Sequence, residues 1–168
     1  MLVINKPVVS KYIIGAYGIM TALMATLGVF FVYAGVVTPM GTSGFITSFG
    51  IVLIVCILLL IVRSLNSTTY RITDTEVLIN TTKLIGGTQR IPLDMIESVE
   101  TTVIPFGIKL FGASFHGGHY TIPSLGRAFL AITNYADGIL IKTKQRCYVI
   151  TPRAPLDFKD AIERQVSL

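Results

Sequence analysis

A run of 51 consecutive residues, from Tyr12 to Val62, contains no Asp, Glu, Lys, Arg or His. About 20 apolar residues of α-helix cross a bilayer core, so this run is too long for a single crossing. A cluster of turn-forming residues, Thr38 to Gly44, interrupts it near the middle. The sequence therefore predicts two transmembrane helices, at about residues 12–37 and 41–62, joined by a short uncharged loop.

The charges that flank this run predict its orientation. Lys6, Lys11 and Arg63 lie at its two outer ends, and the first acidic residue is Asp74. Cytoplasmic loops are enriched in Lys and Arg, so we expect a multi-pass protein of the cytoplasmic membrane with both termini in the cytoplasm. A cleaved signal peptide is the alternative, but its apolar region spans only about 7–15 residues.

Charge and composition divide the chain into two parts. Residues 1–65 form the N-terminal segment and the membrane hairpin, whereas residues 66–168 have ordinary polarity and the length of one small domain. The whole chain carries a net charge of +5, but the second part has 11 basic and 9 acidic residues. This balance argues against a nucleic-acid partner. The absence of ionisable residues from both spans argues against a transport path.

Four small residues fall on one stripe of the first predicted helix: Gly15, Gly18, Ala22 and Ala25. Small residues let helix backbones approach closely in lipid. The stripe indicates helix packing, either against the second span of the same chain or against another copy or another membrane subunit.

After Ser67 the pattern changes to short alternating segments that predict strands. These segments are 70–73, 77–81, 89–92, 98–103, 128–133, 139–143 and 146–150. Ala136-Asp137-Gly138 predicts a hairpin between the strands on either side of it. A terminal helix follows Pro155, with Phe158, Ala161 and Ile162 on one face.

Two stretches of this domain, Tyr70-Arg-Ile-Thr-Asp-Thr-Glu-Val-Leu-Ile and Arg90-Ile-Pro-Leu-Asp-Met-Ile-Glu-Ser-Val, resemble the opening of prokaryotic PH-like domains. Ile139-Leu-Ile-Lys-Thr, Tyr148-Val-Ile-Thr-Pro and Phe158 are similar to the closing strands and helix of that group. The resemblance covers about residues 66–166. It implies a bent seven-stranded sheet, or partly open barrel, with a C-terminal helix. The group is mostly uncharacterised, and many members carry membrane spans beside the domain, so the resemblance implies a fold rather than a function.

The segment 103–120 is unusually apolar for a connection, with Lys109 as its one charged residue. Three interpretations stay open. The segment inserts aromatic rings into the membrane interface with Lys109 near lipid phosphates, or it docks a partner, or it belongs to the domain's own core. The candidate partner-facing or membrane-facing residues are Phe106, Lys109, Phe111, Phe115 and Tyr120.

Basic residues gather around the last predicted turn of the domain. Lys142, Lys144 and Arg146 alternate along the chain, and Arg127 is a further candidate for the same patch. These residues are the best candidates for binding an anion such as a lipid headgroup. The alternative is a charged turn that prevents pairing of sheet edges.

No motif of catalysis, metal binding or cofactor binding occurs in the sequence. His116 and His119 lie three residues apart, but a metal site needs three or four ligands. Asp94, Glu97 and Glu100 recur every three residues, and we expect them to lie on a solvent-exposed face rather than to converge on a catalytic site. We therefore expect no enzyme activity, no metal and no cofactor.

The leading hypothesis is a membrane-anchored PH-like scaffold that binds a protein or peptide partner, or itself, at the inner membrane surface. One alternative is a domain that binds anionic lipid heads. The other is an accessory subunit of a membrane enzyme or transporter.

Overall fold

The computed structural model describes residues 3–37, 41–111, 116–135 and 137–166. The chain divides into two compact units. One is helical and spans Lys11–Arg63; the other is rich in strands and combines the segment before Lys11 with the chain from Ser64 onward. The predicted fold class, a pair of long apolar helices followed by a mainly-β domain with a terminal helix, is confirmed.

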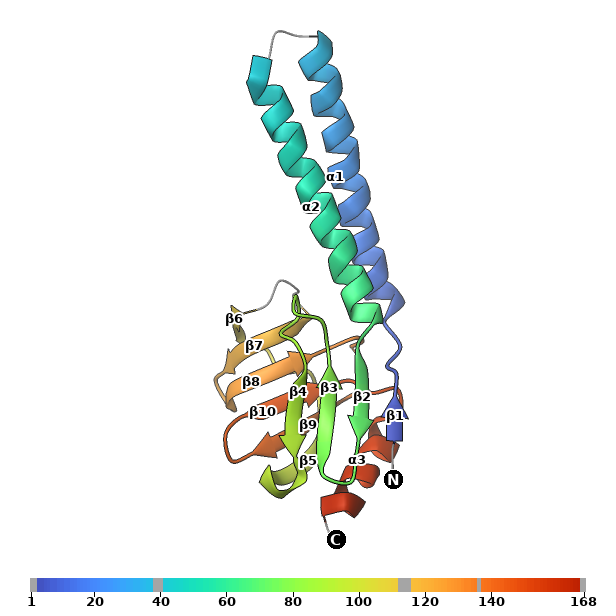
Figure 1. Ribbon diagram of the computed structural model, residues 1–168, viewed down its shortest axis with the longest axis vertical. Helices are drawn as coiled ribbons and strands as arrows, with labels where there is room; N and C mark the ends of the chain where they lie inside the picture. The colour runs from blue at the N-terminus through green and yellow to red at the C-terminus, as the bar shows by residue number, and fades with distance from the viewer. Residues whose placement is uncertain (1–2, 38–40, 112–115, 136, 167–168) are drawn as a thin grey trace. The chain divides into compact units, whose positions relative to one another are not determined.

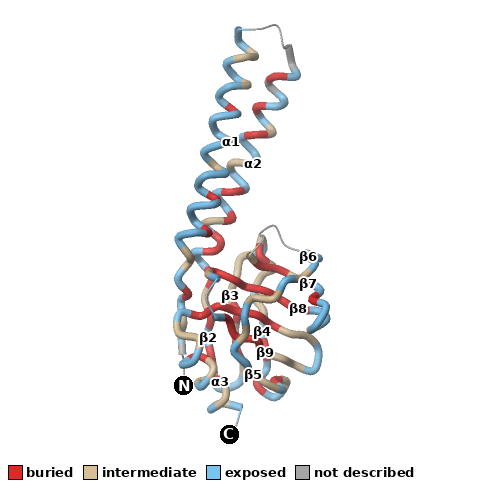
Figure 2. The backbone as a smooth tube through the Cα atoms, turned by 180° about the vertical axis from the view of Figure 1, so that it is seen from behind, coloured by how far each residue is buried: buried red, intermediate tan, exposed pale blue. Residues whose placement is uncertain are grey.

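The helical unit contains α1 (Lys11–Val37) and most of α2 (Gly41–Asn66), which run antiparallel (Figure 1). Both helices are long and apolar enough to cross a membrane. They approach closely at Gly28, where an added side-chain carbon would lie 3.1 Å from Cγ2 of Ile51. Most of their large apolar side chains are exposed (Figure 2), as lipid-facing helices require.

The residues of the predicted small-residue stripe lie at the surface of α1. Gly15, Gly18, Ala22 and Ala25 are all exposed, and a side-chain carbon added at Gly15 or Gly18 would meet nothing within 4 Å. The buried glycine of α1 is Gly28, which lies on a different face. The assignment of this stripe to helix packing therefore stays a prediction.

The strand-rich unit contains two sheets. The first has the order β1-β2-β3-β4 and is antiparallel throughout; its strands are β1 (Val3–Asn5), β2 (Thr69–Ile72), β3 (Glu76–Asn80) and β4 (Gln89–Pro92). The second has the order β5-β9-β10-β8-β7-β6; its strands are β5 (Ile96–Thr102), β6 (Ile108–Phe111), β7 (Gly117–Ile122), β8 (Gly126–Ala131), β9 (Gly138–Thr143) and β10 (Cys147–Ile150). A short 3-10 helix, Leu93–Met95, joins the sheets, and α3 (Pro155–Val166) ends the domain.

The described residues form ten strands in place of the seven expected. The strand β1 precedes the first long helix in sequence but pairs with β2, and Asn5 accepts a 3.0 Å hydrogen bond from the backbone N–H of Arg153. The strands β6 and β7 come from the apolar, glycine-rich segment 103–120. These three strands are short or rich in glycine, so residue pattern alone does not reveal them.

The predicted hairpin between the strands now labelled β8 and β9 is wrong. The strand β10 lies between them, parallel to β8 and antiparallel to β9. The connection that leaves β8 crosses the end of β10, where the backbone N–H of Thr133 donates a 2.9 Å hydrogen bond to Oγ1 of Thr151. Both threonines are buried. The apolar strand β10 pairs on both edges, which a β8–β9 hairpin would prevent.

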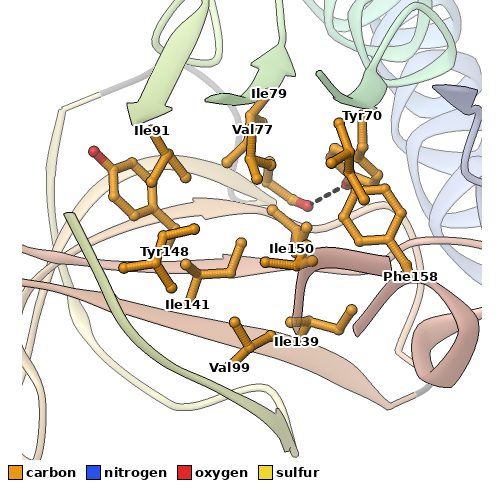
Figure 3. Close-up of a cluster of buried hydrophobic side chains, with 14 of the residues drawn as sticks. Tyr70, Val77, Ile79, Ile91, Val99, Ile139, Ile141, Tyr148, Ile150 and Phe158 are labelled. Atoms are coloured by element: carbon orange, nitrogen blue, oxygen red, sulfur yellow. Dashed lines mark hydrogen bonds between the residues drawn. The ribbon is translucent and has the colours of Figure 1, made fainter. Parts of the chain in front are cut away.

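The main core lies between the two sheets (Figure 3). The first sheet contributes Tyr70, Val77 and Ile79, among others, and α3 contributes Phe158 and Ile162. The second sheet contributes side chains from its strands β5, β8, β9 and β10. The helix face predicted at Phe158, Ala161 and Ile162 is therefore confirmed.

A second cluster lies on the opposite face of the six-stranded sheet. The strands β8, β9 and β10 alternate between the two clusters, so that Phe129 joins the main core and its neighbours Ala128 and Leu130 join the second. Ile104 and Leu125 cover part of this second face. Strands buried on both faces are apolar at consecutive positions, which explains the run from Ala128 to Ile132.

Tyr70 links the two sheets through a buried hydrogen bond. Its ring is fully buried beside Phe158, and its hydroxyl donates a 2.7 Å hydrogen bond to the carbonyl of Ala131 on β8 (Figure 3, dashed line). Burial raises the pKa of this hydroxyl far above its ordinary value, so the group stays protonated and able to donate.

We expect Tyr70→Phe to lower the free energy of unfolding by about 1–3 kcal/mol, because the substitution leaves the Ala131 carbonyl without this donor. Thermal unfolding of the full chain in detergent, followed by tyrosine fluorescence, measures the effect. Tyr135→Phe, at an exposed position, is the control and should change stability much less. Equal effects of the two substitutions would contradict the role of Tyr70.

Gly86 and Gly87 offer a matched pair in the turn between β3 and β4. Both have positive φ, but only at Gly86 would a side-chain carbon meet the Phe129 ring, at 2.6 Å. We expect Gly86→Ala to destabilise the protein by about 1–3 kcal/mol more than Gly87→Ala, since it adds overpacking to backbone strain. The same thermal assay checks this, and equal losses of stability would show that the Phe129 contact is unimportant.

Candidate functional site

The chain between β5 and β6 contacts the domain at Ile104 and at Gly107. Side chains between these two residues and next to them are exposed. Ile104 packs on the second cluster. A side-chain carbon at Gly107 would lie 2.8 Å from the Ile122 side chain and 3.0 Å from the Thr121 carbonyl, so the backbone runs directly against β7 there. Between these anchors Phe106 is 91% exposed.

Three further apolar side chains of this region are exposed. Val103 is 81% exposed, Ile108 69% and Leu110 51%. We call Val103, Phe106, Ile108 and Leu110 the apolar strip. Ile108 and Leu110 belong to β6, which is an edge strand of the six-stranded sheet. The strip combines exposed apolar surface with a strand that has a described neighbour on one side only.

Lys109 turns toward its own domain. Its Nζ atom donates a 3.3 Å hydrogen bond to the Gly117 carbonyl and lies 5.6 Å from the centre of the Tyr120 ring. Partial burial lowers the pKa of this ammonium. In this structure Lys109 therefore contacts its own domain, and a contact with lipid phosphates stays a prediction.

The other aromatic candidates of the segment do not share one location. Tyr120 is buried in the second cluster, so it belongs to the domain's core and not to an exposed surface. The backbone of Phe111 lies in β6 opposite His119. The side chain of Phe111 and the whole of Phe115 lie outside the described part of the chain.

The four basic candidates also separate. On β9, Lys142 forms a 2.8 Å ion pair with Glu100 of β5. The side chain of Glu100 also accepts a hydrogen bond from Ser98, and these contacts lower the pKa of its carboxyl. Lys144 is exposed in the following turn. Neither lysine lines the cavity of Arg127 and Arg146 described next, and binding of an anion by the four residues stays a prediction.

Arg127 and Arg146 line one cavity. It has a volume of about 560 Å³, and His119, Tyr120 and Gln145 also line it. Ala128 of β8 and Cys147 of β10 lie opposite each other in a parallel strand pair. Arg127 immediately precedes Ala128, and Arg146 immediately precedes Cys147. The sequence carries a signal for this pairing, because Arg127-Ala-Phe-Leu and Arg146-Cys-Tyr-Val repeat one pattern at the start of two parallel strands. The residue pattern did not predict that His119 and Gln145 would line the same cavity as the arginines.

The two histidines have different surroundings. Nε2 of His116 lies 2.7 Å from the Tyr135 hydroxyl, whereas His119 stacks edge-on against Phe129, with ring centres 5.2 Å apart. Desolvation lowers the pKa of both, and the nearby charges of Lys109 and Arg146, respectively, lower it further. Across the described ranges, no three His, Cys, Asp or Glu side chains group as a metal site would require.

The acidic candidates lie at the surface. Asp94, Glu97 and Glu100 are all exposed, in agreement with a solvated face, and only Glu100 has an ion pair of the three among the described residues.

We expect Arg146→Gln to raise the pKa of His119, because the substitution removes a positive charge that disfavours the imidazolium, and to leave that of His116 unchanged. Lys109→Gln should have the converse effect, raising the pKa of His116. A histidine NMR titration of the full chain in nanodiscs measures both. A His119 titration that Arg146→Gln does not move would contradict the proximity of the two groups.

Comparison with known proteins identifies the domain. A family model described as "Bacterial PH domain" matches residues 68–166, which covers more than half of the chain and the whole region from β2 to α3. PH-like domains are generally not catalytic. No curated protein and no solved structure matches the chain. Because the match extends over more than half of its residues, the chain belongs to the bacterial PH domain family.

Proposed function

We propose that this protein is a membrane-anchored, non-enzymatic binding protein whose PH-like domain docks a protein partner on the apolar strip. The proposal depends most on one observation. Three side chains within six residues, Val103, Phe106 and Ile108, are 81%, 91% and 69% exposed. Clustered exposed apolar residues are typical of interaction surfaces.

Two features support a preorganised surface. The contacts of Ile104 and Gly107 with the domain fix the backbone on both sides of Phe106. An aromatic side chain held outward in this way loses little conformational entropy on binding. The strip also continues into the edge strand β6, whose outer side can offer backbone hydrogen bonds to an extended segment.

The inward position of Lys109 favours a protein partner over the lipid interface. Surfaces that bind anionic membranes combine apolar side chains with cations that reach lipid phosphates. The single cation of this segment instead contacts Gly117 and Tyr120. A neutral apolar strip suits an apolar segment of another protein.

The two long helices define the place of binding in this proposal. As a membrane hairpin with both termini in the cytoplasm, they would hold the domain at the inner surface of the cytoplasmic membrane. Confinement there raises the effective concentration of any partner in the same membrane. The proposed partner is therefore another protein of that membrane or of its inner surface.

We expect a photo-crosslinking amino acid in place of Phe106, in cells that express the full chain, to give one adduct of defined mass. The same amino acid at Leu156, an exposed apolar position on α3, is the control and should not give that adduct. Phe106→Ser combined with Ile108→Ser should reduce recovery of the complex in mild detergent at least tenfold, whereas Leu156→Ser should not.

The mass of the adduct decides between the alternatives. A stoichiometric second protein supports the proposal, and a larger membrane enzyme or transporter would make this chain its accessory subunit. An adduct of two copies of this chain would show that the strip binds a second copy of the same chain instead of another protein. Equal recovery of the complex by the double variant and the Leu156→Ser control would refute docking on the strip.

A further inference from the structure

The register of the six-stranded sheet brings two arginines together at one corner. On β8, Ala128 pairs with Cys147 of the parallel strand β10, so Arg127 and Arg146 stand at the next positions of neighbouring chains. On the other side of β8, Arg127 pairs with Thr121 of β7. Residues at paired positions share a face of the sheet. Both arginines line the same 560 Å³ cavity.

Arg127 and Arg146 bring positive charge to this cavity. Within the described part of the chain, no carboxylate forms an ion pair with Arg127 or Arg146. Of the two side chains, Arg146 has a described aromatic contact, with its guanidinium 5.9 Å from the centre of the Tyr148 ring. Two guanidinium groups that line one cavity repel each other, and an anion bound between them would offset that repulsion.

Three other cations of the domain are paired with carboxylates. Lys142 is neutralised by Glu100 at 2.8 Å, Lys159 by Glu163 at 2.9 Å, and Arg90 by Glu76 at 3.6 Å. Arg127 and Arg146 have no such pair among the described residues, and what sets them apart from the exposed Lys144, which also has none, is that they line one cavity.

Neutral hydrogen-bonding groups complete the lining. His119 and Gln145 bring an imidazole and a carboxamide, and Tyr120 and Leu110 supply apolar walls. The proximity of Arg146 also helps to keep His119 neutral, so that it can donate one hydrogen bond without adding charge. Such a lining suits an anion with several acceptor oxygens attached to a larger, less polar group.

We propose that this cavity, lined by Arg127, Arg146, His119 and Gln145, binds the phosphate group of a phosphorylated ligand. The planar guanidinium donates two parallel hydrogen bonds to phosphate oxygens, and two arginines together match the charge of a phosphate dianion. The phosphate can belong to a soluble phosphorylated compound or to a phospholipid headgroup, since both present the same chemistry. The phosphate contacts proposed here are separate from the docking of a protein on the apolar strip, although Leu110 of the strip also lines the cavity.

The test uses the full chain in nanodiscs of neutral phosphatidylcholine, with the arginine Nε–H signals observed by NMR. Inorganic phosphate and glycerol phosphate are titrated in one arm, and phosphatidic acid is included in the bilayer in the other. We expect one arm to shift the signals of both arginines in a saturable manner. Arg127→Gln and Arg146→Gln should each weaken this binding at least tenfold, whereas Lys144→Gln, which removes an exposed charge nearby, should change it less than twofold.

The two arms identify the source of the phosphate. Saturation by glycerol phosphate indicates a soluble ligand, and saturation by phosphatidic acid alone indicates a headgroup. Thermal unfolding of each variant shows whether it is folded. If a glutamine variant is not folded, the charge-conserving variants Arg127→Lys and Arg146→Lys replace it in the binding assay. The proposal is overturned if neither arm shifts the arginine signals, or if Lys144→Gln weakens binding as much as the arginine substitutions.

Discussion

The six-stranded sheet has to bury both of its faces, and the rest of the domain follows from this constraint. Its central strands carry apolar side chains at consecutive positions, so each places half of them on either side. The four-stranded sheet and α3 cover one face, where Tyr70 adds a buried hydrogen bond between the sheets. Ile104, Leu125 and their neighbours cover part of the other. The irregular segment after β5 is therefore a structural cover as well as a connection, which explains why Gly107 lies directly against β7.

Both candidate surfaces lie where this cover ends. The strands β6 and β7 extend the sheet and contribute no described side chain to the main core, although Ile85, in the turn between β3 and β4, lies against Gly117 of β7. Along β6 the extension leaves the apolar strip exposed. At the start of β8 and β10 it leaves the cavity with Arg127 and Arg146. One part of the domain thus combines an apolar surface suited to a protein and a basic cavity suited to a phosphate, while the opposite edge strand β5 carries the paired charge of Glu100.

The sequence predicts the elements of this fold better than their partners. The long helices follow from the uncharged run, and seven of the strands and α3 from apolar periodicity and turn residues. The β8–β9 hairpin failed because the same turn signal, Asp137-Gly138, also suits a connection that crosses the end of a third strand. The sequence could not divide the basic candidates, because the alternation of Lys142, Lys144 and Arg146 ignores the turn between β9 and β10, and Glu100, the partner of Lys142, comes from a strand distant in sequence. Tyr120 is buried and Phe106 is exposed because of how the strands pair in the sheet. The local residue pattern does not reveal that pairing.

The central claim is that the apolar strip is an occupied binding surface in the cell. Hydrogen–deuterium exchange of the β6 amides, Ile108–Phe111, tests it most directly, in membranes that contain the chain at its native level and in membranes in which it is overexpressed far beyond any partner. The central strand β9 serves as the internal standard. We predict slow exchange in β6 at the native level and fast exchange on overexpression, with β9 slow in both. Equally fast exchange of β6 in both membranes would contradict the claim.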